Sequence, residues 1–108
     1  MSDEARQRLA DMRSFAKLAQ RLVGSMKLGE FIEDERTRYA VQYLLLVMGE
    51  ASIHVPSEVK ARLVNVPWPK LQGLRNRLAH AYFAIEAATV YVAVSKDLPE
   101  LLEALEDR

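Results

Sequence analysis

The chain has 108 residues, half of which are hydrophobic, and its 15 basic and 15 acidic side chains give a formal net charge of zero. This length fits one domain, expected over residues 1–108, and the apolar content argues against disorder. With no cysteine and two histidines, the sequence predicts no disulfide, no metal site and no cofactor. No apolar run reaches about 18 residues, so no membrane-spanning helix is predicted. The charged N-terminus lacks a secretory apolar region, and we expect a cytoplasmic protein.

The charges are unevenly distributed along the chain. Between residues 58 and 82, five basic residues face one acidic residue, a net charge of +4, whereas residues 97–108 carry a net charge of −4. A basic segment attracts phosphate, but overall neutrality argues against strong, indiscriminate binding of nucleic acid. The simpler alternative is that both segments are solvated helix faces. Charge alone leaves both interpretations open.

Helical periodicity dominates the first half of the chain. Apolar residues at spacings of three and four predict a long helix that begins near Asp3 and stops at Gly24. A short helical turn is expected over residues 28–33. A second long helix is predicted after Asp34, a good N-cap residue, and it must end before Pro56. The residues expected on its buried face are Ala40, Leu44, Val47, Met48 and Ala51.

The second half continues the helical pattern after a rigid, proline-rich corner over residues 66–69. Before this corner, Ser57 is expected to cap a short segment over residues 58–63. After it, a helix is predicted over residues 69–81, because proline suits the first turn of a helix. Its expected apolar stripe consists of Leu71, Leu74 and Leu78.

Residues 89–94 are β-branched and aromatic, and propensity alone predicts a strand there. A lone strand would have no partner in a helical chain, however, and Val90, Val94 and Leu98 recur four residues apart, as in a helix. We therefore predict a helix, followed by a last helix near Pro99. Together the elements predict an all-α bundle of four or five helices.

The most informative segment is an octet on the helix predicted over residues 69–81, which reads Arg75-Asn76-Arg77-Leu78-Ala79-His80-Ala81-Tyr82. Asn76 and His80 lie one turn apart on the same helix face. Arg75 lies about 140° from His80 around an ideal helix, but its long side chain can reach the same pocket. Tyr82 joins them only if the helix ends or bends near Ala81.

The octet combines residue types that suit phosphate chemistry. Arginine offers a fixed charge and a fork of donors that fits phosphate, and histidine, with an unperturbed pKa of about 6.5, exchanges a proton near neutral pH. Arg75 and His80 are therefore candidate catalytic residues for metal-free phosphodiester cleavage. The candidates for positioning the substrate are Asn76, Arg77 and Lys70. The alternative is structural, since such side chains at a helix end also satisfy carbonyls or pair with carboxylates.

Several segments match one family in order and spacing: Asp34-Glu35-Arg36-Thr37, Gly49-Glu50-Ala51, Val66-Pro67-Trp68, the stretch from Gly73 through the octet to Phe83, and Asp97-Leu98-Pro99. Over nearly its whole length the chain resembles the HepT ribonuclease toxins of the HEPN superfamily (higher eukaryotes and prokaryotes nucleotide-binding). It departs from the family after the octet, where Phe-Gly-Ile-Asp is common and this chain has Phe83-Ala84-Ile85-Glu86. A second departure is Tyr91, where tryptophan is common.

The resemblance implies an all-α HEPN-type bundle that forms a homodimer, with the Arg–His motifs of the two copies facing each other across a cleft. It implies a metal-independent endoribonuclease, and relatives suggest transfer RNA as a target. It also implies a toxin–antitoxin system. The partner would be a nucleotidyltransferase antitoxin of the MntA type, which silences the toxin by transferring AMP to the motif tyrosine, here Tyr82.

Two functional hypotheses follow. In the first, neutral His80 takes the proton of an RNA 2′-hydroxyl and Arg75 stabilises the charge on the phosphate, which yields a 2′,3′-cyclic phosphate. One His80 acts as base and acid in turn, or a two-fold dimer supplies a second. In the other, Arg75 and His80 hold a nucleotide phosphate in a non-catalytic docking module for a nucleotidyltransferase. We expect His54, just before Pro56 at a helix end, to be structural.

Overall fold

Every element of the computed structural model, which describes residues 1–106, is helical, and no strand occurs in that range. This confirms the predicted all-α class. The elements are α1 (Asp3–Val23), α2 (Leu28–Glu33), α3 (Glu35–Ile53), α4 (Ser57–Arg62), α5 (Trp68–His80), α6 (Ala87–Val92), the π-helical turn η1 (Ala93–Asp97) and α7 (Leu98–Glu106). Because α6, η1 and α7 follow one another without a break, the described chain has six helical segments, where four or five were expected.

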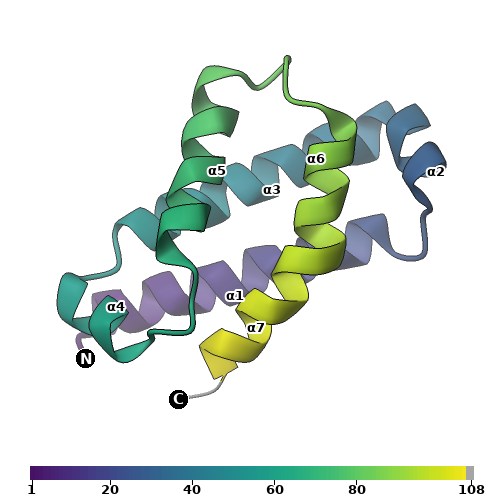
Figure 1. The fold of residues 1–108 in the computed structure, drawn as a ribbon. Coiled ribbons are helices and arrows are strands. Elements are labelled where there is room, and N and C mark those ends of the chain that lie inside the picture. Colours follow the sequence, from purple (N-terminus) through teal and green to yellow (C-terminus); the bar gives the residue numbers. More distant parts are fainter. Residues whose placement is uncertain (107–108) are drawn as a thin grey trace.

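The helices form two layers (Figure 1). Helices α1 and α3 lie side by side, and α5 and the continuous α6–α7 helix cross over them. The apolar core fills the space between the layers, and its largest fully buried side chains include Leu9, Met12, Phe31, Leu45, Met48, Leu78, Leu101 and Leu105. No helix in the described part of the chain is both long and apolar enough to cross a membrane.

Side chains cap the first turns of α1 and α3, and the cap at Asp34 lies where the sequence predicts it. The Ser2 side chain accepts a hydrogen bond from the amide of Ala5, and the Asp34 side chain accepts one from the amide of Thr37. These bonds satisfy amides that have no partner within the first helical turn. Helix α1 ends at Gly24, whose φ of 54° is readily adopted only by glycine.

The buried face of α3 is wider than predicted. Leu44, Met48 and Ala51 are buried as expected, and Val47 is half-buried, but Ala40 is exposed. Because α3 contacts α1 on one side and α5 on another, residues beyond a single apolar stripe are covered. The additional buried residues are Val41, Gln42, Leu45, Gly49 and Ser52.

The corner between α4 and α5 sets where α5 begins. Ser57 is the first residue of α4 and not its cap, since Pro56 occupies the N-cap position without a side-chain hydrogen bond. The indole Nε1 of Trp68 donates to the carbonyl of Leu63 at 3.1 Å. Pro69 lies in the first turn of α5 as predicted. The Trp68 hydrogen bond therefore fixes the start of this helix to the end of α4.

The ambiguous stretch over residues 89–94 is helical, as predicted, and Val90, Val94 and Leu98 are all buried. The last helix, α7, begins at Leu98, as predicted near Pro99, and the π-helical turn η1 joins it to α6 without a break. Glu86, which stands where the family commonly has aspartate, occupies the N-cap position of α6 but makes no side-chain cap bond. The preceding turn forms without glycine, and no non-glycine residue in the described chain has a positive φ.

Helices α3 and α5 approach each other most closely at Gly49. A Cβ atom added to this glycine would lie 2.6 Å from the Cβ of Arg75, which is shorter than any real contact between carbons. Glycine is therefore required by packing, although Gly49 has an ordinary helical backbone. The first residue of the octet is thereby packed directly against the backbone of α3.

We predict that Gly49→Ala lowers the free energy of unfolding by about 1–3 kcal/mol, because the added methyl forces α3 and α5 apart. Urea denaturation followed by circular dichroism measures this change. The matched control is Gly73→Ala in the middle of α5, where an added Cβ meets nothing within 4 Å. This control should instead gain about 0.5–1 kcal/mol from higher helix propensity. Equal effects at the two glycines would contradict the packing argument.

Candidate active site

The octet lies on the last turns of α5 and in the loop that follows. Helix α5 ends at His80, and Ala81 leaves helical geometry with φ of −138°. Asn76 and His80 are both exposed, on the face opposite the buried Leu71 and Leu78. Within residues 1–106, His80 forms no hydrogen bond or ion pair. Its imidazole is therefore open to a ligand.

Arg75 points toward α3, where it meets a carboxylate. Its Nε donates to Oε1 of Glu50 at 2.9 Å, and Nη2 lies 2.9 Å from the same oxygen. The other oxygen, Oε2, lies 3.1 Å from Nε2 of His54, which donates when that nitrogen carries the proton. The hydrogen bond from Arg75, and then that from His54, lowers the pKa of the Glu50 carboxyl. Glu50 thus stays ionised and fixes the guanidinium of Arg75.

This arrangement leaves part of the Arg75 guanidinium free for a ligand. A guanidinium has five N–H groups. Two point at Glu50, and one on Nη1 donates to Oδ1 of Asn76 at 3.1 Å. One N–H on each terminal nitrogen remains without a partner, and the side chain is 30% exposed. A fixed guanidinium that keeps a free N–H group on each terminal nitrogen can donate to a phosphate.

Tyr82 folds back onto α3 once α5 has ended. Its hydroxyl donates to the carbonyl of Tyr39 at 2.8 Å, and the two rings stack with centroids 6.0 Å apart. The carbonyl of Tyr82 accepts a hydrogen bond of 2.8 Å from Nε2 of Gln42, a side chain that is 1% exposed. Burial, together with the nearby phenols of Tyr39 and Tyr43, raises the pKa of Tyr82. The loop after α5 is therefore anchored at two points.

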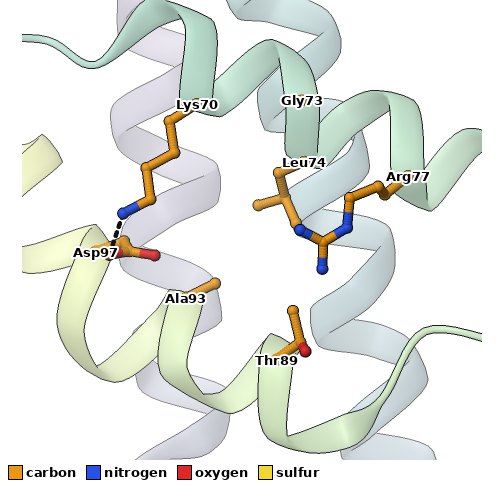
Figure 2. A pocket seen from close by; sticks show the side chains of 7 residues that line it. All are labelled: Lys70, Gly73, Leu74, Arg77, Thr89, Ala93 and Asp97. Carbon is orange, nitrogen blue, oxygen red and sulfur yellow. Dashed lines mark hydrogen bonds and ion pairs between the residues drawn. The ribbon is translucent and has the colours of Figure 1, made fainter.

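The structure places Arg77 and Lys70 on the other flank of α5. They line a groove of about 260 Å³ that runs between α5 and the α6–η1 segment (Figure 2). In this view the Arg77 side chain extends into the groove between Leu74 and Thr89, and it forms no ion pair within the described residues. Lys70 instead contacts Asp97 at 2.9 Å, which raises the pKa of Lys70.

Sequence reasoning missed two residues that organise the site. Glu50 was part of a matching segment but had no assigned role, and its position four residues before His54 is the signal that could have linked them. Gln42 gave no signal, because a buried glutamine is recognised only when its distant partner is known. Within residues 1–106, no three acidic or histidine side chains gather in a way that could hold a metal ion.

Comparison with known proteins identifies relatives of the whole helical unit. The family model "Ribonuclease HepT-like" matches residues 7–107. A Methanocaldococcus jannaschii protein named "Putative RNase MJ1380" is 38% identical over 77 residues, which cover 71% of each chain. A Thermococcus cleftensis protein named "Probable ribonuclease HepT" is 29% identical over 93 residues, 86% of this chain and 84% of the relative. No solved structure gives a significant match.

The fold and the candidate site define an all-helical protein whose Arg75 and His80 lie on α5 and whose Tyr82 follows it, with Arg75 and Tyr82 directed to α3 and His80 exposed. The family match covers nearly the whole chain, including every residue of that site. This chain belongs to the HepT-like ribonuclease family of HEPN proteins. The resemblance read from the sequence segments is thereby confirmed.

We predict that Glu50→Gln lowers the free energy of unfolding at pH 7 by less than about 1 kcal/mol, because solvent screens a pair this exposed. The folded-state pKa of Glu50 is lowered from 4.5, so its stabilisation is present above that value and is lost as pH falls through the lowered pKa. Urea denaturation at several pH values from 7 down to 3 should show the free energies of unfolding of the wild type and of Glu50→Gln becoming equal. Glu103→Gln, at an exposed residue without an ion pair in the described chain, is the control. A difference that stays constant with pH would contradict the assignment.

Proposed function

We propose that this protein is a metal-independent endoribonuclease whose catalytic residues are Arg75 and His80. The observation that carries the proposal is the exposed end of α5, where His80 is unpaired within the described chain and Arg75 keeps two N–H groups for a phosphate. Membership in a ribonuclease family supports RNA as the substrate. Asn76 orients the guanidinium, while Arg77 and Lys70 contact the RNA backbone on the other flank of α5. Transfer RNA is the first target to test.

In the proposed reaction, neutral His80 removes the proton from an RNA 2′-hydroxyl, and the 2′-oxygen attacks the adjacent phosphorus. The bond between phosphorus and the 5′-oxygen of the next nucleotide breaks, and that oxygen takes up a proton. The products are a 2′,3′-cyclic phosphate and a 5′-hydroxyl. Arg75 stabilises the charge on the non-bridging oxygens, a contribution often worth about 3 kcal/mol.

The proton for the leaving 5′-oxygen needs an acid. A single chain presents one histidine at the end of α5, and its other histidine, His54, lies against Glu50. We therefore propose a two-fold homodimer that places two α5 ends across one cleft, so that the second copy's histidine can serve as the acid. In a monomer, His80 would have to return the proton it has just taken.

The proposed partner is a nucleotidyltransferase antitoxin of the MntA type, with which the protein forms a type VII toxin–antitoxin system in the cytoplasm. Silencing occurs by transfer of AMP to the Tyr82 hydroxyl. That hydroxyl is bound to the Tyr39 carbonyl, and its pKa is raised, so the transferring enzyme must release it and supply a base. The attached phosphate then competes for Arg75 and repels RNA.

We predict that His80→Ala lowers the rate of cleavage of a defined RNA in EDTA by about 10²–10⁴-fold, because the general base is lost. The products of the wild type should end in 2′,3′-cyclic phosphate, identified by mass spectrometry. Asn65→Ala, at an exposed position in the loop between α4 and α5, should cleave like the wild type. Full cleavage by His80→Ala, or 3′-hydroxyl ends, would contradict the mechanism. Binding of AMP without any cleavage would instead indicate the non-catalytic docking module.

We predict that Tyr82→Phe abolishes AMP transfer by the partner, because the accepting hydroxyl is removed. Intact-mass spectrometry after incubation with partner and ATP measures the transfer. Tyr91→Phe is a matched control, since the Tyr91 hydroxyl likewise donates to a backbone carbonyl, that of Met26 at 2.6 Å, and this variant should be labelled like the wild type. Undiminished labelling of Tyr82→Phe would show that another residue accepts AMP.

A further inference from the structure

An exposed cluster of aromatic side chains lies next to the end of α5. Phe83 is 84% exposed and Tyr43 on α3 is 58% exposed, far more than aromatic residues in a packed helical protein normally are. Phe83 follows His80 by three residues, so their Cα atoms are at most about 11 Å apart. An exposed aromatic ring this close to a candidate active site is a candidate contact for the substrate.

The cluster is held in place despite its exposure. The Phe83 ring meets the rings of Tyr82 and Tyr39 edge-on, with centroids 5.3 and 5.8 Å apart. Tyr82 is in turn fixed to α3 by the hydrogen bonds to Tyr39 and from Gln42. Because the Phe83 ring is already packed against two tyrosines while 84% of the residue remains exposed, stacking of a flat ligand on it costs little further entropy.

The charge beside the cluster favours an anionic ligand. The guanidinium of Arg38 lies over the Tyr39 ring, 4.9 Å from its centroid. Within residues 1–106, Arg38 forms no ion pair, and its Nε is buried without a hydrogen-bond partner. Aromatic faces next to cations form the surface that binds single-stranded nucleic acid, where bases stack and phosphates pair with arginine.

We propose that the Phe83 ring, packed against Tyr39 and Tyr82, is a stacking platform for an unpaired RNA base next to the scissile phosphate, an inference that rests on the proposed function and names its substrate class. Bases can stack on a side chain only when they are released from a duplex. The platform therefore selects loops, bulges and single-stranded ends over double-stranded RNA. Arg38 pairs with a phosphate of the same strand, and His80 faces the phosphate to be cleaved.

The experiment uses an unstructured RNA that contains one 2-aminopurine, whose fluorescence falls when it stacks. Binding is measured in a His80→Ala background so that the RNA stays intact, and kcat and KM are measured separately with His80 present. The Phe83→Leu variant removes the aromatic face but keeps an apolar side chain, and Phe83→Trp restores the face. Val64→Ala is the control, because Val64 is 76% exposed in the loop between α4 and α5.

We expect Phe83→Leu to weaken RNA binding and raise KM about five- to tenfold with kcat within about twofold, and to abolish the fluorescence decrease. Phe83→Trp and Val64→Ala should bind like the parent protein, and a duplex of the same sequence should bind more weakly than the single strand. Light scattering should give the same oligomeric state for every variant.

Unchanged binding and KM in Phe83→Leu would overturn the platform while leaving the ribonuclease intact. If Phe83→Leu no longer formed the dimer, the platform would also be refuted, because the aromatic cluster would then be a contact between two copies of the chain. Conversely, Phe83-dependent binding and fluorescence decrease without any cleavage by the wild type would support the platform and refute the ribonuclease. Failure of the His80→Ala protein to bind any RNA would overturn the platform as well.

Discussion

The close approach of α3 and α5 at Gly49 is the constraint on which the rest of the site depends. Because this glycine has no side chain, the backbone of α3 comes within contact distance of Arg75, and Glu50 then reaches the guanidinium at 2.9 Å. Overpacking at this point would separate the carboxylate from the arginine and change the direction in which α5 runs. The crossing therefore determines where Arg75 points and holds α5, which carries His80, against α3.

A second set of contacts on α3 determines the path of the chain after α5. Gln42 and the carbonyl of Tyr39 form hydrogen bonds with Tyr82. The rings of Tyr82 and Tyr39 both pack against the ring of Phe83. One helix thus positions the arginine through Glu50 and the loop through residues located two to three turns earlier. The buried Gln42 is stable in the core because its amide has a partner in the Tyr82 carbonyl. The loop that follows the exposed His80 is thereby anchored to α3.

Much of this fold could be predicted because it follows from local rules. Asp34 and Gly24 mark helix ends through side-chain capping and a positive φ, and the four-residue spacing of Val90 and Val94 overrides their β propensity. The site was predictable only in part. The motif spacing singles out Arg75 and His80 as candidates, but the sequence carries no information on which carboxylate faces the arginine. Contacts such as those of Glu50 and Gln42 depend on how distant helices cross, which spacing within one helix cannot reveal.

The double role of Tyr82 connects the proposed silencing to the proposed recognition of RNA. In the folded chain its hydroxyl donates to Tyr39 and its ring supports Phe83. Once AMP is esterified to that hydroxyl, the oxygen has no proton to donate, and the bulky nucleotide cannot remain against α3. The loop must then move away from α3, and Phe83 moves with it. In this scheme a single modification places negative charge beside Arg75 and removes the stacking surface, so it blocks both the chemistry and the binding of the substrate.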